Sequence, residues 1–279
     1  ELEIPDRVKV IRTIISELTR LASHQLWWGV MGMDLGALTT YFYAFRDREM
    51  INDIFEETCG ARLTMNYNIP GGLMFDIHPN FVQRVKDFIV HFKTKLPEYD
   101  RLLSGNVIFL NRTKGVGILS KEDAISFGVT GPVGRGSGFA CDVRKRHPYS
   151  AYDRVSFKEC LETTGDTFSR YKVRIAEMWE SISIIEQLID QIPEGEHKVA
   201  TKAVIKLPKG EFYQRVETAR GELGVYINSD GNKNPYRVKF RSPGFSNLSA
   251  LHHTAVGGKI GDLVAIMASF DFVIPDIDR

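Results

Sequence analysis

The sequence is poor in cysteine, with Cys59, Cys141 and Cys160 as the only three among 279 residues. An odd count without a Cys-x-x-Cys pair argues against a disulfide framework and against a self-contained zinc or iron–sulfur site. A reducing compartment is the simpler expectation. An excess of one charge is also missing, because 36 Lys and Arg residues face 35 Asp and Glu residues, a net charge of +1. This balance argues against nucleic acid as a partner.

Long hydrophobic runs are absent too. No apolar stretch approaches the ~18 residues that suggest a membrane span, so the chain is expected to lie against a membrane without crossing it. The opening residues, Glu1 to Pro5, lack the basic start and apolar middle of a signal peptide. What is present, 43% hydrophobic and 25% charged residues, is typical of a globular protein with a sizeable core.

Apolar residues at three- and four-residue spacing predict a mainly α, multihelical fold. Turn residues at positions 229–232 separate two stretches that are typical of strands, so a small antiparallel β element is expected near residues 200–241. Gly60 is expected to end a helix, and Ser120 with Asp123 fits a capping box. The expected helices cover residues 5–28, 41–58, 81–92, 120–128, 166–192 and 261–270, and the expected strands cover 224–228 and 236–240, with a short β-branched stretch at 201–207.

Two motifs invite a functional interpretation that the residues do not support. The glycine-rich run Gly131 to Gly138 has no preceding strand and no suitably placed lysine, so a tight structural loop is favoured over a phosphate-binding loop. Of the seven histidines, only His252 and His253 are adjacent, and no His-x-x-x-His pair exists, so no metal site is predicted. The absence of a Gly-x-Ser-x-Gly elbow argues against serine hydrolase chemistry.

Asp34 is the acidic residue with the most unusual surroundings. It stands between two predicted helices, within the apolar segment Gly32-Met-Asp-Leu-Gly-Ala-Leu38. An N-cap role is one interpretation, in which its carboxylate accepts backbone N–H bonds of the following helix. The alternative is a carboxyl group whose pKa is raised by the apolar surroundings and which takes part in proton transfer.

A set of segments in fixed order adds a resemblance that the patterns alone do not give. They extend from the first helix to the end of the chain. The segments are residues 11–36 (IRTIISELTRLASHQLWWGVMGMDLG), 58–67 (TCGARLTMNY), 69–76 (IPGGLMFD), 134–153 (GRGSGFACDVRKRHPYSAYD), 165–181 (GDTFSRYKVRIAEMWES), 219–231 (ARGELGVYINSDG) and 262–279 (DLVAIMASFDFVIPDIDR). Together they closely resemble the D subunit of respiratory complex I, the component of NADH–quinone oxidoreductase that is homologous to the [NiFe]-hydrogenase large subunit.

The resemblance implies a single hydrogenase-large-subunit-like domain over residues 1–279 that lacks the N-terminal part of the family. That part carries the His and Tyr ligands of the quinone headgroup, so this chain alone is expected to be inactive. The implied activity is that of a subunit of the proton-translocating NADH:quinone oxidoreductase, an NAD-linked complex of the respiratory chain.

The resemblance also assigns site residues. Asp34 corresponds to the acid that pairs with the headgroup histidine, and it is the expected catalytic residue. Val30, Phe42 and Val273 correspond to positions that line the quinone cavity together with Asp34. Arg62 and Thr64 correspond to positions beside a [4Fe–4S] cluster that a neighbouring subunit holds, and many family members have His at the position of Thr64.

The hydrogenase relationship can be tested at the C-terminus. Hydrogenase large subunits end in Asp-Pro-Cys-x-x-Cys, whose cysteines bind nickel and iron, whereas the matching stretch here begins at Asp271. Val273 and Asp276 stand where the two cysteines would be, and neither can replace a bridging thiolate. We therefore expect no metal on this chain, and quinone, with menaquinone as the expected type, as substrate.

The expected partners are other complex I subunits: the cluster-bearing B subunit, the C subunit and the membrane-arm H subunit. The expected location is peripheral, on the cytoplasmic face of the plasma membrane, without a transmembrane helix. Two alternatives stay open. One is a hydrogenase-like subunit of a related ferredoxin-dependent energy-converting complex, and the other is a scaffold module without redox function.

Overall fold

The computed structural model describes residues 2–202 and 204–278, which form two compact units. The first unit comprises Glu1–Arg112, Ser150–Lys158 and Arg174–Ala200. The second comprises Thr113–Tyr149, Glu159–Val173 and Thr201–Arg279. The boundary falls inside the long helix α8 (Thr167–Ile189), and each unit is described below by itself.

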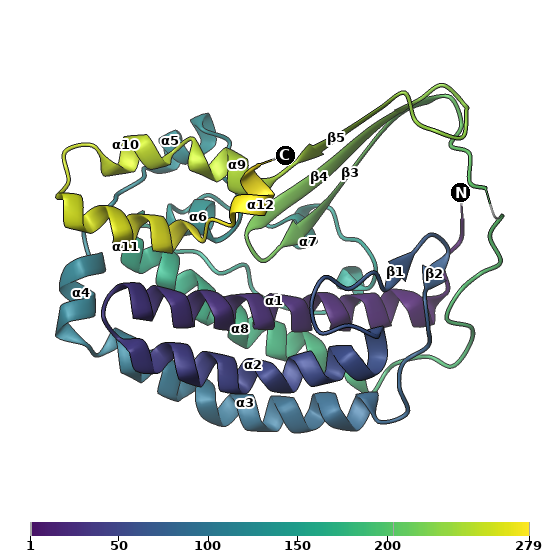
Figure 1. Cartoon of the computed structure of the whole chain (residues 1–279), viewed down its shortest axis with the longest axis horizontal. Helices are drawn as coiled ribbons and strands as arrows, with labels where there is room; N and C mark the ends of the chain where they lie inside the picture. The colour runs from purple at the N-terminus through teal and green to yellow at the C-terminus, as the bar shows by residue number, and fades with distance from the viewer. Residues whose placement is uncertain (1, 203, 279) are drawn as a thin grey trace. The chain divides into compact units, whose positions relative to one another are not determined.

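The first unit is built on long helices whose apolar faces form its core. Helix α1 (Asp6–Asp34) is followed by α2 (Leu38–Cys59) after a three-residue turn, and α3 (Phe81–Ser104) runs along α2. Figure 1 shows these three helices side by side. In their core the ring of Trp28 stacks on that of Tyr99, with centroids 4.0 Å apart. The unit also contains α4 (Val107–Thr113) and a 3-10 turn (Tyr152–Arg154).

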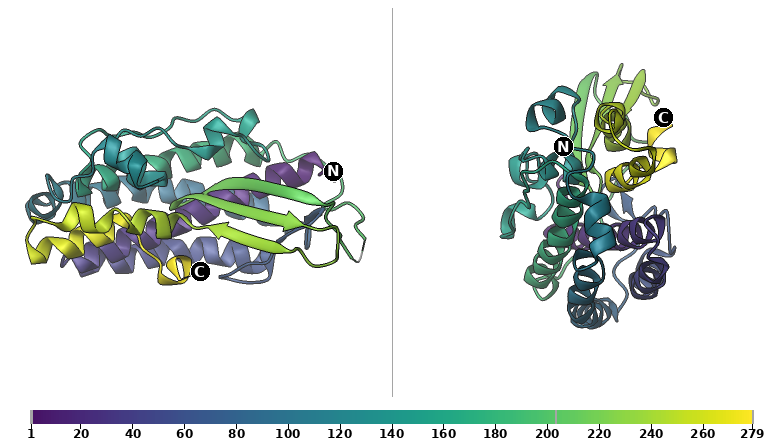
Figure 2. Two further views of the ribbon diagram at one scale, coloured as in Figure 1. Left: turned by 90° about the horizontal axis from the view of Figure 1, so that it is seen from above. Right: turned by 90° about the vertical axis from the view of Figure 1, so that its left-hand side faces the viewer.

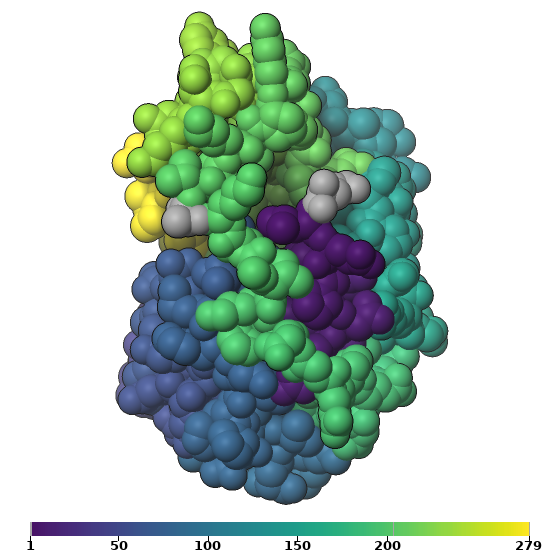
Figure 3. All heavy atoms as spheres, turned by 90° about the vertical axis from the view of Figure 1, so that its right-hand side faces the viewer, coloured from purple at the N-terminus to yellow at the C-terminus, as the bar shows by residue number. Residues whose placement is uncertain are grey.

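A short hairpin of β1 (Asn68–Ile69) and β2 (Gly72–Leu73) follows α2. One Arg12 nitrogen, Nη2, donates to the carbonyls of Ile69 and Gly72 at 2.8 and 2.7 Å, which ties the hairpin to α1. Arg7 donates to the carbonyl of Pro193 at 2.8 Å, and Figure 3 shows the green segment after α8 lying over the purple start of α1.

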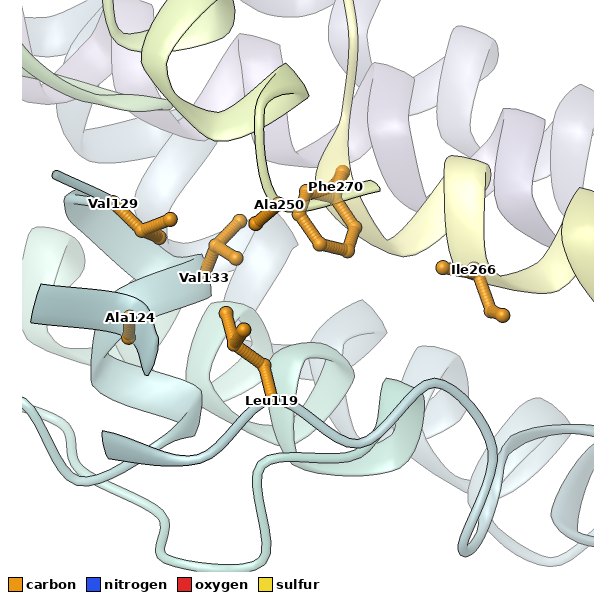
Figure 4. Packing of buried hydrophobic residues seen from close by; sticks show 7 residues of the cluster. All are labelled: Leu119, Ala124, Val129, Val133, Ala250, Ile266 and Phe270. Carbon is orange, nitrogen blue, oxygen red and sulfur yellow. The ribbon is translucent and has the colours of Figure 1, made fainter. Parts of the chain in front are cut away.

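The second unit combines short helices with the three-stranded antiparallel sheet, whose strand order is β3-β4-β5. Figure 2 shows the strands side by side. Side chains of several short elements converge in its core, with Leu119, Val133 and Phe270 among them (Figure 4). The elements are α5 (Lys121–Ser126), α6 (Gly131–Gly136), α7 (Val143–Arg146), β3 (Gly210–Thr218), β4 (Gly221–Ser229), β5 (Arg237–Arg241), α9 (Pro243–Leu248), α10 (Leu251–Ala255), α11 (Ile260–Phe270) and α12 (Ile274–Ile277).

The predicted mainly α class with a small antiparallel sheet is confirmed. The local end signals are confirmed as well: Gly60 caps α2 in a left-handed conformation, with φ 76°. At the start of α5, the Ser120 hydroxyl accepts from the backbone N–H of Asp123 at 3.0 Å. These ends follow from residues that are close in sequence, which is why the sequence predicted them.

Two predictions were wrong in detail. Residues 131–136 form the buried helix α6 rather than a loop, because Pro132 suits a first helical turn and the glycines allow close packing. Strand β3 was missed, since the sequence pattern before residue 224 showed only a short β-branched stretch at 201–207. Residue 203 lies outside the described residues, and the rest of that stretch forms no strand. Strand β3 exists because it pairs with β4 along nine residues, and such a partner is not visible in local sequence.

Candidate functional site

The turn between α1 and α2 holds three of the predicted site residues. Asp34 is the last residue of α1, Val30 lies one turn earlier, and Phe42 lies on the second turn of α2. Buried Thr40 locks the two helices together, since its hydroxyl lies 2.7 Å from the Ala37 carbonyl and 3.1 Å from the Gly29 carbonyl. The structure therefore places Val30, Asp34 and Phe42 on one helical hairpin.

Asp34 does not cap the second helix. The N-cap of α2 is Ala37, and the side chain of that residue accepts no capping bond. The capping interpretation was wrong because α1 continues through Asp34, which lies three residues before the N-cap Ala37. The expectation of a raised pKa is met: partial removal of water raises the pKa of the Asp34 carboxyl above 3.8. Its place at the negative end of the α1 dipole acts in the same direction.

Exposed apolar side chains surround this end of the hairpin. Phe42 is 61% exposed and Leu38 is 54% exposed, while Val30 is half-buried. Beside the turn lies a small cavity of about 140 Å³, lined by Leu35, Gly36, Ala37, Leu103, Asn106, Ile108 and Phe109. This volume is below the roughly 300 Å³ at which pockets for drug-sized ligands begin, so the cavity alone does not accommodate a quinone ring with its tail.

Arg62 and Thr64 lie together in the loop after α2. The Arg62 guanidinium forms ion pairs with Glu49, Asp53 and Glu56, which follow one face of α2. Its bonds to Glu56 and Asp53 raise the pKa of Arg62 further above its ordinary value. These contacts attach the loop to the C-terminal half of α2.

Thr64 has an unusual backbone. Its φ of 50° is left-handed, a region that β-branched residues rarely occupy. Its exposed hydroxyl donates to the Leu63 carbonyl at 2.8 Å. The main chain of the loop therefore bends at Thr64, the residue that the resemblance assigns to a position beside a cluster.

The two groups of predicted residues are far apart along α2. Phe42 lies near the start of this helix and Arg62 lies beyond its end at Cys59. With about 1.5 Å of rise per residue, the intervening helix separates them by roughly 25 Å. Asp34 and Thr64 are therefore too far apart to contact the same small group at the same time. Val273, the remaining predicted residue, belongs to the second unit, where it is the half-buried N-cap of α12.

Sequence reasoning missed a buried polar network between α1 and α8. Glu17, Arg20 and His24 recur at three- and four-residue spacing on α1, inside an otherwise apolar stripe, and all three are at most 2% exposed. His24 Nε2 lies 2.9 Å from Glu177 Oε2. Burial lowers the pKa of His24 to about 4, so the ring is neutral at pH 7.

Glu17 is the centre of the second half of this network. It accepts from the Tyr152 hydroxyl at 2.5 Å, from the Ser181 hydroxyl at 2.6 Å and from Arg20 Nε at 3.3 Å. The sequence signal that could have revealed this network is the recurrence of polar and charged residues at helical spacing within an apolar run.

Asp47 is a buried acid whose burial the local sequence does not reveal. It lies in the charged run Arg46-Asp-Arg-Glu49, and a run of charges on a helix is usually a solvated face. Asp47 is instead fully buried and accepts from the Tyr99 hydroxyl at 2.8 Å and from His91 Nε2 at 3.0 Å. Burial opposes its ionisation, but bonds from Arg46, His91 and Tyr99 prevail and lower its pKa. The sequence shows the charge of Asp47 but not the partners on α3.

Two of the three cysteines, Cys59 and Cys141, are buried thiols. Cluster ligands are thiolates, and burial raises the pKa of both Cys59 and Cys141 to about 12. Within the described ranges 2–202 and 204–278, no three His, Cys, Asp or Glu side chains gather as a metal site. In the same ranges no helix is long and apolar enough to span a membrane.

Comparison with known proteins decides the family. The family model described as "Respiratory-chain NADH dehydrogenase, 49 Kd subunit" matches residues 34–206 and 197–279. The chain belongs to this family. The resemblance to the D subunit of complex I is thereby confirmed, and the described fold is that of a family member.

Individual relatives agree with the family. The C/D subunit of the NADH-quinone oxidoreductase of Bacteroides fragilis is 56% identical over 278 residues, which is all of this chain and 52% of that protein. Its counterpart in Bacteroides thetaiotaomicron is 55% identical over the same shares. The D subunit of the NADH-quinone oxidoreductase of Bacillus mycoides is 45% identical over 279 residues, 76% of its length. The chain thus spans about half the length of the C/D relatives.

Proposed function

We propose that the protein to which this chain belongs reduces quinone as part of a proton-translocating NADH–quinone oxidoreductase. Reduction of a quinone to the quinol takes two electrons and two protons. In this proposal the electrons arrive from a [4Fe–4S] cluster of a neighbouring subunit, and Asp34 supplies or relays a proton. Val30 and Phe42 are proposed to provide apolar contacts for the ring and tail, and Val273 is proposed as a quinone contact because of the family resemblance.

The observation that carries the proposal is the setting of Asp34. Its carboxyl stands at the end of α1, and its pKa is raised, while the exposed apolar Leu38 starts α2 after the turn. A carboxyl whose pKa moves toward neutrality is a better proton donor at physiological pH than an ordinary aspartate. Asp34 is also accessible, so a substrate can reach it.

The electron-donating side is proposed at the loop of Arg62 and Thr64. Buried thiols with raised pKa values make this chain a poor cluster ligand, which favours a cluster on a partner, the B subunit. The C subunit and the membrane-arm H subunit are the other proposed partners. The proposed location is peripheral, on the cytoplasmic face of the membrane, and menaquinone is the proposed quinone. We also propose that residues 1–279 form one domain of the family and that this chain is inactive on its own.

The test is Asp34→Asn in the complete complex. Asparagine keeps the size of the side chain but carries no exchangeable acidic proton. Quinone turnover should fall by about tenfold or more, since general acid catalysis typically contributes 10²–10⁴-fold. Electron transfer from NADH to ferricyanide should stay unchanged, because it bypasses the quinone. Asp87→Asn is the matched control, because Asp87 is an exposed carboxylate on α3 that bonds to Gln83 on the same helix.

The alternatives give different outcomes. Normal quinone turnover in Asp34→Asn, with normal assembly on a native gel, would refute the proposed role of Asp34. A complex that reduces quinone with ferredoxin but not with NADH would identify the hydrogenase-like alternative. If the chain is a scaffold module, Asp34→Asn should lower the amount of assembled complex and leave the quinone turnover per assembled complex unchanged.

A further inference from the structure

The last residues of the second unit fold into a compact structure that we call the C-terminal hook, residues 271–278. It starts where Phe270 at the end of α11 is buried in the core. Asp271 then turns the chain in a left-handed conformation, with φ 58°. Arg220 fastens this turn, as its Nε lies 3.1 Å from the Asp271 carbonyl and its Nη2 lies 3.2 Å from the Asp271 carboxylate.

The far end of the hook is attached by Asp276. One oxygen of its carboxylate accepts from the backbone N–H of Gly244 at 3.0 Å. Gly244 lies in the first turn of α9, where helical N–H groups have no partner within their own helix. Figure 1 shows α12 next to α9. Asp276 therefore connects the end of the chain to a helix that precedes it by about thirty residues.

The first turn of α9 is arranged to receive this contact. Pro243 has no N–H to satisfy, and Phe245 donates to the Ser242 hydroxyl at 3.4 Å. The N–H of Gly244 takes its acceptor from elsewhere in the chain, and Asp276 supplies it. A Cβ atom on residue 244 would lie 2.6 Å from the Asp276 carboxylate and 3.3 Å from Ile277. The glycine is thus needed for the hook to come this close.

The same hook holds Val273. The Val273 carbonyl accepts from the N–H of Asp276 at 2.9 Å and from that of Ile277 at 3.2 Å. Val273 and Asp276 are consequently joined by one turn of backbone, and a shift of Asp276 displaces Val273. The neighbouring Ile274 is 70% exposed, so this turn presents an apolar surface.

We propose that Asp276 is a positioning residue: its carboxylate fixes the hook on α9 and thereby sets the place of Val273 in the quinone site. This inference rests on the proposed function. Relative to the hydrogenase motif, Asp276 stands where a metal-binding cysteine would be. Here its carboxylate accepts a hydrogen bond from the Gly244 N–H, so the residue at this position fixes the hook to α9.

The experiment compares two variants of α9 capping in the complete complex. Asp276→Ala and Ser242→Ala each remove one side-chain acceptor from the first turn of the same helix, but only Asp276→Ala releases the hook. Hydrogen exchange of residues 271–278 should accelerate by about tenfold in Asp276→Ala and stay unchanged in Ser242→Ala. The KM for quinone should rise by about fivefold in Asp276→Ala alone, with the ferricyanide rate unchanged. Asp276→Asn keeps an acceptor oxygen and should restore most of both properties.

Each result separates the inference from the proposed function. Unchanged exchange in Asp276→Ala would overturn Asp276 as the anchor. Faster exchange with an unchanged quinone KM would overturn the link between the hook and the substrate. Val273→Ala tests the underlying function directly: a normal KM there places Val273 outside the quinone site, whatever the Asp276 variants do. An altered KM in Val273→Ala together with a normal Asp276→Ala would refute this inference alone.

Discussion

At the residue scale, the structure changes the meaning of individual charged side chains. Asp34 was compatible with a helix cap and with a proton-transfer group, and its place inside α1 removes the first possibility. Asp47 and Glu17 look like surface charges in the sequence but are buried and hydrogen-bonded. A sequence gives the residue type, whereas burial and partners decide whether a carboxyl is a solvated charge or part of the core.

His24 leads to a prediction about pH. Its folded pKa of about 4 is below the ordinary value of 6.5, so the unfolded state binds more protons between these two values. The contribution to stability is complete above pH 6.5 and is lost as the pH falls toward 4. The loss is on the order of 3 kcal/mol by 1.36 kcal/mol per pKa unit. Urea unfolding of the chain from pH 7.5 to 4.5 should show this slope, and His24→Gln should reduce it.

Glutamine keeps a donor near Glu177 but does not titrate. His24→Gln therefore removes the titrating group and retains a possible hydrogen bond to Glu177. The exposed His252 provides the control, because His252→Gln removes an imidazole from the surface. A pH slope that is the same in His24→Gln and in the parent chain would contradict the assignment. The remaining titratable groups are the same in both proteins, so their contributions cancel in the comparison.

At the element scale, the α1–α2 hairpin depends on close contact between two helices. Apolar periodicity predicted both helices, but the distance between them is set by small residues at the crossing. A Cβ atom on Gly32 would lie 2.1 Å from the Thr40 hydroxyl, and one on Gly29 would lie 2.8 Å from Ala44. The hairpin that carries Asp34 and Phe42 therefore tolerates no side chain at these two positions.

Gly32→Ala should destabilise the chain by about 1–3 kcal/mol, the usual cost of overpacking a core. The gain in helix propensity from alanine, below about 1 kcal/mol, does not offset this clash. Chemical denaturation of Gly32→Ala, Thr40→Ala and the double variant measures the coupling. Removal of the Thr40 side chain should relieve part of the clash, so the double variant should lose less than the sum. Additive losses would show that the contact is not the cause.

At the scale of the whole molecule, the chain forms two units, and its segments alternate between them. Each unit is completed by segments from distant parts of the sequence, as Ser181 on α8 contacts Glu17 on α1 in the first unit. The sequence suggested one domain without an obvious linker. The two units are defined by packing between segments that are far apart along the chain, and such packing is not readable from composition.

The whole chain should bind no metal. Its cysteines are few, and burial raises the pKa of Cys59 and Cys141 to about 12, which disfavours thiolate ligands at neutral pH. Elemental analysis of the purified chain should give iron, nickel and zinc far below one atom per molecule. As a control, the chain is refolded in excess zinc and its thermal unfolding midpoint is measured. Binding of zinc at a specific site would raise this midpoint. A stoichiometric metal would contradict the prediction.

The sequence by itself determined the class of fold, most helices and their ends, and the family. These follow from information within a few residues, such as apolar spacing, the Gly60 cap and the Ser120 capping box, or from motifs that extend along the chain. Only the tertiary structure decided that 131–136 is a buried helix, that β3 exists, that Asp47 is buried and that Asp276 holds Gly244. The physical reason is the same in each case. Burial and pairing are properties of two segments in contact, and the free energy that selects them arises from a partner distant in sequence.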